Sequence, residues 1–168
     1  MAKELTASEI LALRKKIRKY PYLAQVDGVD LGPLNGPPTV EGDIETFDVT
    51  LYETEAEIQA RYLTRNDLTL TLTTRNIDKL MELHAAYKKG DDLLDESRKI
   101  EIVLVPITKD ASAPTLTFPN AYINPGLSYN PGDNEAHYGE LVFTCKPGED
   151  GLPFVWSGTA SSSGGSEG

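Results

Sequence analysis

The chain of 168 residues is poor in the side chains on which disulfide pairing, catalysis and metal binding depend. It has one cysteine, Cys145, and two histidines. A single cysteine excludes a disulfide within the chain and is typical of synthesis in a reducing cytoplasm. Every apolar run is shorter than the roughly 20 residues that a membrane-spanning helix needs. The first residues, MAKELT, have no apolar core and no cleavage signature, so we expect no signal peptide.

The sequence also lacks the motifs of the common enzyme classes. It contains no Gly-x-Ser-x-Gly, no Walker loop, no Gly-x-Gly-x-x-Gly and no Cys-x-x-Cys. His84 falls on the apolar side of a predicted helix, which indicates a packing role. Cys145 alternates with Phe143 and Leu141, which is typical of a small buried side chain in a strand. We therefore predict a protein that is not an enzyme and that uses no cofactor and no metal.

Two acidic loops contain side chains that could bind a metal ion. Asp133, Glu135 and His137 combine carboxylates with an imidazole, but their spacing matches no familiar set of ligands, so a metal site is the weaker interpretation. Residues 91–96 contain four carboxylates without the ligand spacing and central glycine of a calcium loop. Solvent exposure after the end of a helix explains that cluster more simply.

Acidic residues outnumber basic ones by 26 to 16, which gives a formal net charge of -10. Proteins that grip nucleic acid do so through Lys and Arg contacts to phosphate. We therefore expect no nucleic-acid binding. The negative charge serves solubility alone, or it repels something that the protein must not bind; which face carries it decides between the two.

The first predicted element is a helix over residues 6–20. Thr6 and Glu9 have the spacing of a capping box, and Pro21 ends the helix. An apolar stripe recurs at helical spacing: Ile10, Leu13, Ile17 and Tyr20. The other side is basic: Arg14, Lys15, Lys16, Arg18 and Lys19. An ordinary surface helix, a segment on a membrane surface and a segment that docks on a neighbouring copy all fit this pattern.

The rest of the chain is predicted to be rich in β-strands. Alternating apolar and polar residues predict strands over 47–52, 68–74, 99–108, 116–123 and 138–145, with a further short one at 154–156. Residues 23–26 and 29–31 are predicted to pair as a small ribbon around the turn at Asp27-Gly28. Asn76 caps a helix that runs through Lys89 and ends at Gly90. The Asn-Pro-Gly triplets at 124–126 and 130–132 predict two tight turns.

This order of elements predicts an α+β, β-rich fold, which we expect to be an antiparallel β-sandwich or an open barrel with one side-packed helix and an N-terminal helix. The expected organisation is an amphipathic helix over residues 1–20, one β-rich domain over 21–158 and a flexible Ser/Gly tail over 159–168.

The segment 118–147, FPNAYINPGLSYNPGDNEAHYGELVFTCKP, resembles the C-terminal part of phage tail tube (major tail) proteins, which are related to the tubes of contractile injection systems. The similarity extends from about residue 20 to residue 158. It includes the loop-rich start, the Thr/Leu strand and the helix after it. The basic N-terminal helix departs from that family, many of whose members begin with a strand or an extended arm.

The resemblance implies a virion structural protein that assembles with itself into stacked, hexameric rings. The rings form a hollow tail tube through which viral DNA passes into the host without specific binding. Further partners would be the other tail proteins: tape measure, terminator, and baseplate or tip. The protein would be made in the host cytoplasm, reside in the virion tail and contact no membrane.

The resemblance also gives the charge a role, because carboxylates in the lumen would repel DNA phosphates. Asp48, Glu101 and Glu140 are predicted to line the lumen, since each lies on the polar side of a predicted strand. The loops are predicted to supply the contacts between rings. The residues named for those contacts are Asp27, Leu34, Asp91 and Asp92.

Other functions fit parts of the pattern. A head decoration protein or a tail terminator of a phage is the nearest alternative, and neither would polymerise into a tube. A carbohydrate-binding β-sandwich is a second alternative, in which the eight tyrosines and Trp156 would offer stacking surfaces. Polymerisation separates the tube from all of these, and assembly that stops at one ring indicates a terminator.

Overall fold

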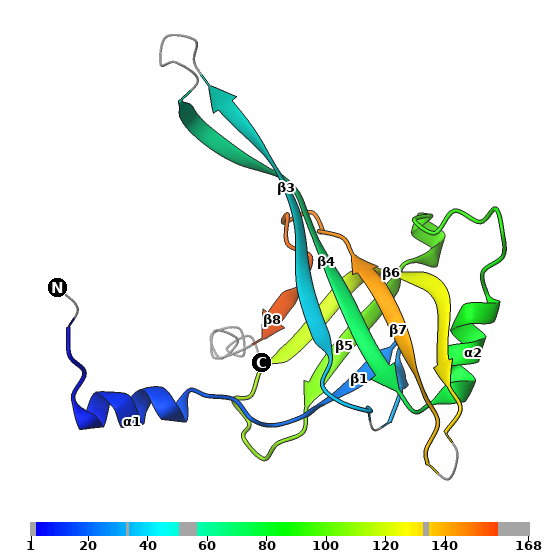
Figure 1. Cartoon of the computed structure of the whole chain (residues 1–168), viewed down its shortest axis with the longest axis horizontal. Helices are drawn as coiled ribbons and strands as arrows, with labels where there is room; N and C mark the ends of the chain where they lie inside the picture. Colours follow the sequence, from blue (N-terminus) through cyan, green and yellow to red (C-terminus); the bar gives the residue numbers. More distant parts are fainter. Residues whose placement is uncertain (1–2, 33, 51–56, 133–134, 158–168) are drawn as a thin grey trace, which may run out of the picture.

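The computed structural model describes residues 3–32, 34–50, 57–132 and 135–157 (Figure 1). Within them, eight strands form one antiparallel sheet in the order β2-β1-β5-β6-β7-β4-β3, and β8 pairs with β6. The strands are β1 Tyr22–Val26, β2 Val29–Asp30, β3 Thr39–Thr50, β4 Ile58–Thr74, β5 Ile100–Pro106, β6 Thr115–Asn130, β7 Tyr138–Cys145 and β8 Val155–Ser157. The helices are α1 Ala7–Lys15, α2 Ile77–Ala85 and the short 3-10 helix η2 Glu96–Arg98.

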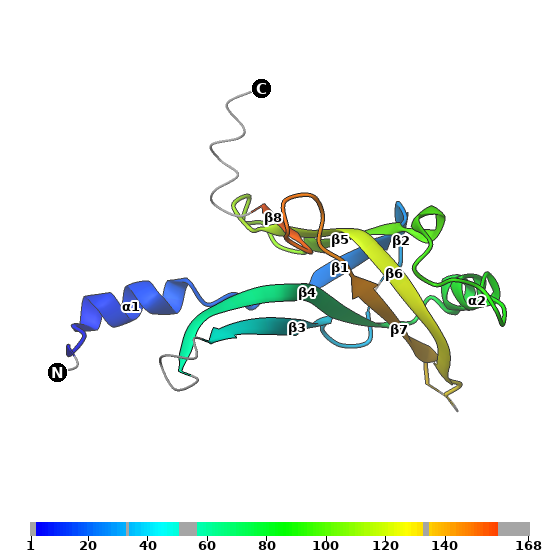
Figure 2. The same ribbon diagram turned by 90° about the horizontal axis from the view of Figure 1, so that it is seen from above.

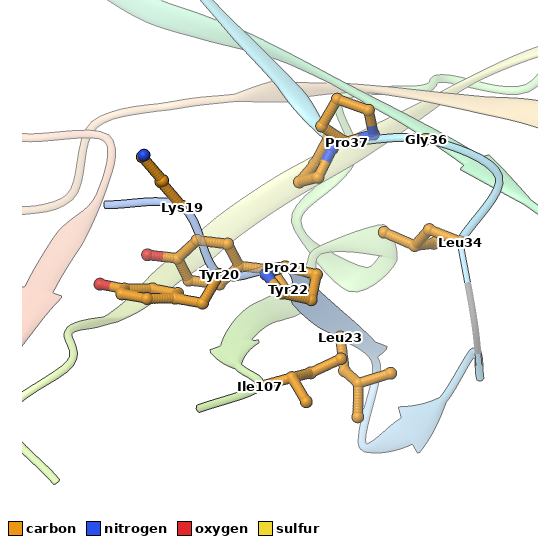
Figure 3. Close-up of a pocket in the computed structure, with 10 residues that line it drawn as sticks. Lys19, Tyr20, Pro21, Tyr22, Leu23, Leu34, Gly36, Pro37 and Ile107 are labelled. Atoms are coloured by element: carbon orange, nitrogen blue, oxygen red, sulfur yellow. The ribbon is translucent and has the colours of Figure 1, made fainter. Parts of the chain in front are cut away.

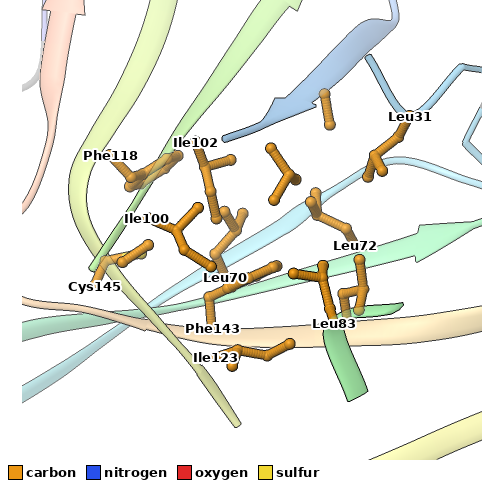
Figure 4. Packing of buried hydrophobic residues seen from close by; sticks show 14 of the residues in the cluster. Leu31, Leu70, Leu72, Leu83, Ile100, Ile102, Phe118, Ile123, Phe143 and Cys145 are labelled. Carbon is orange, nitrogen blue, oxygen red and sulfur yellow. The ribbon is translucent and has the colours of Figure 1, made fainter. Parts of the chain in front are cut away.

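The predicted α+β, β-rich class is confirmed. Because all the strands belong to one open sheet, the structure corresponds to the open barrel and not to a sandwich of two separate sheets. The sheet curls, so that β1 and β5 lie over β4 and β7 (Figure 2). Between them lies one hydrophobic core, to which β1, β4, β5, β6 and β7 all contribute (Figure 4). Its fully buried members include Leu70, Leu72, Ile102, Phe118 and Phe143.

The helix α2 closes one end of this core. Asn76 caps it by accepting a hydrogen bond from the Lys79 N–H, as the sequence predicted. The helix ends at Ala85, four residues before the predicted end, and Gly90 takes its positive φ of 99° in the turn that follows. Leu80 is buried against β6 and β7, where Gly139 leaves room for it.

The N-terminal helix is shorter than predicted. Its capping box is present: the Glu9 N–H donates to the Thr6 hydroxyl over 3.2 Å, and the Thr6 N–H donates to the Glu9 carboxylate over 2.8 Å. The helix then ends at Lys15, well before Pro21. Closely spaced basic residues disfavour the next turn, and α1 has no buried residue that would stabilise a longer helix.

Turns and bulges account for the other differences. The β1–β2 turn forms as predicted, with φ values of 53° at Asp27 and 79° at Gly28. The prediction of a tight turn at residues 124–126 was wrong. The triplet lies inside β6, where the register to β7 shifts between Asn124 and Ser128, so the proline sits in a bulge of a continuous strand. The second triplet begins at the end of β6. The predicted Ser/Gly tail over residues 159–168 lies outside the described residues.

Candidate assembly surfaces

The largest difference from the predicted fold is a long β-hairpin. The sequence predicts one short strand over residues 47–52 and a second that begins at residue 68; the structure has β3 of 12 residues and β4 of 17 residues, which begins at Ile58. β7 pairs with β4 only over Leu68–Thr74, so residues 58–67 of β4 pair with β3 alone. We call this part of the hairpin, residues 43–50 with 58–67, the arm; it projects from the body of the sheet (Figure 1).

The arm carries large apolar side chains in solvent. Phe47 and Tyr62 lie directly opposite each other in the register, and they are 61% and 59% exposed. The other large apolar side chains of the arm that are about half exposed or more are Ile44, Ile58 and Leu63. A two-stranded ribbon of this kind is at best marginally stable in water by itself. The arm therefore presents a surface that suits contact with another molecule.

Ion pairs fix the arm where it leaves the body. Asp67, 5% exposed, accepts a hydrogen bond from the Lys146 Nζ over 2.9 Å, which links β4 to the chain just after β7. On β4, Arg65 pairs with Asp43 and Glu45 of β3, and its pKa is raised chiefly by the hydrogen bond to Asp43. The Asp67–Lys146 pair ties the arm to the body of the sheet, and the Arg65 pairs join the two strands within the arm.

The sheet has a polar face opposite its core. Thr69, Thr71 and Thr73 alternate with buried Leu70 and Leu72, so they lie on the side away from the core. Their register partners on β7 are Thr144, Val142 and Glu140. On β3 the same face carries Glu41, Asp43, Glu45 and Phe47, which follow one another at every second position. We call this surface the outer face.

β3 is also an edge strand. It is the last strand in the sheet order, so within the described residues one side of its backbone, over 12 residues, has no strand beside it. The opposite end of the sheet is β2, which is only two residues long. A long free edge is a template for pairing with another chain. This edge makes the sheet geometrically competent to continue into a neighbouring molecule.

The three residues predicted to line a lumen lie far apart. Asp48 is on the arm and pairs with Arg61, whose Nε donates over 2.6 Å and lowers the pKa of the Asp48 carboxyl. Glu140 is on the outer face opposite Thr73, most of the length of β4 away from Arg61. Glu101 points outward from β5. The structure does not bring them together, and their role in a lumen stays a prediction.

Another set of carboxylates, which lie closer to one another, was not predicted from the sequence. Glu41, Asp43 and Glu45 share the outer face of β3, at the sheet edge. The alternation of these acids with Gly42 and Ile44 was a usable signal for a strand. The Gly- and Pro-rich stretch that ends at Gly42 obscures this signal, because such a composition is typical of a loop.

The four residues predicted to contact a neighbouring ring mostly serve their own loops. The Asp91 carboxylate accepts from the Lys88 N–H and from Arg98, and Asp92 accepts from the Leu94 N–H. Asp27 lies in the β1–β2 turn and donates its N–H to the Glu101 carbonyl over 2.9 Å. Leu34 is half-buried against the core and bridges to Thr74. Their contact with another ring stays a prediction.

An apolar hollow of about 480 Å³ lies where the N-terminal segment enters the sheet (Figure 3). Tyr20, Tyr22, Leu34, Pro37 and Ile107 are among its lining residues. Burial is the main cause that raises the pKa of the Tyr22 hydroxyl, followed by Tyr20. The hollow suits an apolar side chain of a partner better than a charged ligand.

The structure shows the surroundings of the cysteine and of the histidine that were candidates for catalysis or metal binding. Cys145 is buried, and burial raises its pKa to about 12, so its thiol is a poor nucleophile. The His137 Nδ1 lies 2.6 Å from the Tyr129 hydroxyl. Asp133 is outside the described residues, and among those described no three His, Cys, Asp or Glu side chains are grouped as metal ligands. In the same part of the chain, none of the helices has the length and apolar character to cross a membrane.

No protein-family model matches the chain, and no curated protein matches its sequence. Solved structures do share its fold. The tube-terminating cap of the anti-feeding prophage has a TM-score of 0.57 at 10% identity, over 84% of this chain and 91% of that one. A chain of the extended sheath-tube complex of PVC, an extracellular contractile injection system, has a TM-score of 0.56 at 14% identity, over 92% of this chain and 99% of that one. The fold implied by the resemblance to tail tube proteins is therefore confirmed.

Proposed function

We propose that this protein is a structural subunit that assembles with copies of itself into stacked rings of a hollow tail tube. The proposal is carried by β3 and the arm: within the described residues the 12-residue edge of β3 has no strand beside it, and the projecting arm exposes apolar side chains, including Phe47 and Tyr62. Such a surface is costly in a monomer, because exposed edges and apolar patches promote association. It is useful in a subunit whose neighbour covers it.

The open sheet supports a ring. Its long free edge is β3, and its other end is the short β2 beside β1, so the two ends of the sheet differ. A contact between two different surfaces is heterologous, and repeating it closes a ring if the rotation permits. The similarity in fold to a chain of the PVC sheath-tube complex supports the same assembly. Six subunits per ring is the number that the resemblance to tail tube proteins implies.

The lumen is the finer part of the proposal. With a net charge of -10, an inner surface bearing carboxylates would repel the phosphates of DNA that passes through. Asp48, Glu101 and Glu140 remain candidates, and the outer-face position of Glu140 beside three threonines suits a non-adhesive wall. The test is a virion that carries Asp48→Asn, Glu101→Gln and Glu140→Gln together. Normal tubes with slowed DNA ejection are expected, and unchanged ejection would count against an acidic lumen.

A second candidate is a tube-terminating cap, which the similarity in fold to the anti-feeding prophage cap favours. A cap and a tube subunit differ in how far assembly proceeds. Negative-stain electron microscopy of the purified protein over a concentration series separates them. Long hollow filaments with a regular axial repeat would establish the tube, and rings that never stack would indicate a cap. Monomers that persist at high concentration would overturn both proposals.

A further inference from the structure

The helix α1 stands apart from the rest of the molecule. None of its nine residues is buried, and it extends away from the sheet (Figure 1). The chain that follows is held to the body, because the Arg18 guanidinium lies 5.4 Å from the centre of the Trp156 ring of β8. A helix this short is marginal in water without packing. The segment that follows α1 is therefore held to the body of the molecule, while α1 itself packs on no apolar surface.

The chemistry of α1 defines the surface that would fit it. Ile10 and Leu13 lie one turn apart and are 40% and 48% exposed. Arg14 and Lys15 occupy the last turn, and three further basic residues follow: Lys16, Arg18 and Lys19. A complementary surface must combine apolar side chains with carboxylates.

The arm and the start of its edge strand have that combination. Phe47 and Tyr62 are both exposed and lie opposite each other in the strand register, and Glu41, Asp43 and Glu45 precede Phe47 on the same face of β3. Residues 39–50 and 57–67 together carry six carboxylates against two arginines. The most basic segment of the chain and this acidic, apolar surface are thus both present on every copy.

We infer that α1 of one copy docks on the outer face of the arm of a second copy. Ile10 and Leu13 pack on Phe47 and Tyr62, while Arg14 and Lys15 lie beside Asp43 and Glu45, and Glu41 extends the acidic surface along the same face of β3. The inference rests on the proposed self-assembly and names the contact that would join copies. A lipid surface is the poorer partner, since an interfacial helix needs a broader apolar face with aromatic anchors, and α1 has neither.

Charge reversal in trans tests the contact. The helix variant carries Arg14→Glu and Lys15→Glu. The arm variant carries Glu41→Lys and Asp43→Lys, and Arg65 keeps Glu45 and Asp67 as partners in it. The wild type is expected to self-associate in sedimentation velocity, and each variant alone is expected not to. Mixing the two should restore association, because each then offers a complementary partner. A matched control, Lys88→Glu with Lys89→Glu, makes the same charge change on an exposed turn and should associate normally.

Disulfide trapping tests the same contact without relying on charge. A Leu13→Cys copy and a Tyr62→Cys copy are mixed under mild oxidation; buried Cys145 does not compete. A covalent heterodimer is expected. Leu94→Cys, 53% exposed in the loop after α2, replaces Tyr62→Cys as the control and should give none.

The outcomes separate this inference from the proposed function. The docking would be overturned, and the tube proposal retained, if the wild type formed tubes, both charge-reversal variants associated fully and no specific disulfide formed. A specific disulfide without tubes under any condition would keep the docking and remove the tube. Binding of wild type, but not of the helix variant, to phosphatidylglycerol vesicles, with no disulfide, would overturn the docking in favour of a lipid surface.

Discussion

Replacing Gly139 by alanine tests how α2 is seated on the sheet. A Cβ built at Gly139 meets the Leu80 Cδ2 and lies 2.5 Å from the Ser128 carbonyl oxygen. One contact is with a buried core side chain, and the other is with the backbone of β6, so neither can move freely. Overpacking costs typically 1–3 kcal/mol, and two such contacts place this substitution near about 3 kcal/mol.

Alanine also reduces the freedom of the unfolded chain, which gives back about 0.4–1 kcal/mol. The net loss of stability for Gly139→Ala is therefore about 2 kcal/mol. Gly126 is the matched control, because it lies in the same sheet, on β6, and a Cβ there meets nothing within 4 Å. Gly126→Ala should be neutral or stabilise by up to about 1 kcal/mol.

The assay is urea unfolding followed by circular dichroism, at a concentration where both variants are monomeric. We expect the two free energies of unfolding to differ by about 3 kcal/mol, or roughly 6–12 °C in Tm for a chain of this size. Equal stabilities, or a more stable Gly139→Ala variant, would refute the packing of Leu80 against Gly139. A loss at Gly126 as large as that at Gly139 would show instead that β6 tolerates no added methyl.

Three further predictions concern single groups. Because burial raises its pKa to about 12, Cys145 should resist Ellman's reagent at pH 8 until urea unfolds the chain; rapid labelling of the native protein would contradict the buried strand position. Asp67→Asn should lower the free energy of unfolding by roughly 2–3 kcal/mol, which is less than the roughly 3–5 kcal/mol lost when a fully buried ion pair is broken, because Lys146 is partly exposed. An unchanged urea midpoint would refute a structural role for the Asp67–Lys146 pair. The pKa of the Glu9 carboxyl is lowered, first by the hydrogen bond from the Thr6 N–H and next by the one from Lys3. The ionised Glu9 carboxylate therefore stabilises α1 fully at a pH above the ordinary pKa of glutamate, and this stabilisation is lost as the pH falls through the lowered pKa. An NMR titration giving Glu9 an ordinary or raised pKa would exclude the capping box.

Helices and strands that pack one face on the core were predicted correctly from their sequence patterns. Leu68, Leu70 and Leu72 alternate with threonines because one side of β4 meets the core and the other does not, and the strand was recognised. The cap of α2 by Asn76 was likewise local and predictable. The alternation rule did not lead to the strand on the β4 side of the arm, although Ile58, Ala60 and Tyr62 alternate there with Gln59 and Arg61, which is a usable signal for a strand. That alternation does not mark a buried face, because both sides of the arm are exposed in the monomer.

The site residues were less predictable because their environments depend on distant parts of the chain. Asp48 was correctly placed on a strand, but its pairing with Arg61 follows from the hairpin register. Leu34 is predicted from the sequence to lie in a loop that contacts another ring, yet its bridge to Thr74 ties it to the end of β4. Short-range patterns identify which residues are polar; only the fold determines which of those charges are already paired.

The charges on the edge of β3 bear on the kind of assembly that can form. If two copies paired through this edge in antiparallel fashion, Glu41, Asp43 and Glu45 of one would face the same carboxylates of the other. Like charges opposite each other destabilise a strand pair, so the symmetric dimer is disfavoured. A partner that presents a different edge or a basic segment meets no such repulsion. The edge thus favours contacts between unlike surfaces, which are the contacts that build rings and filaments instead of closed dimers.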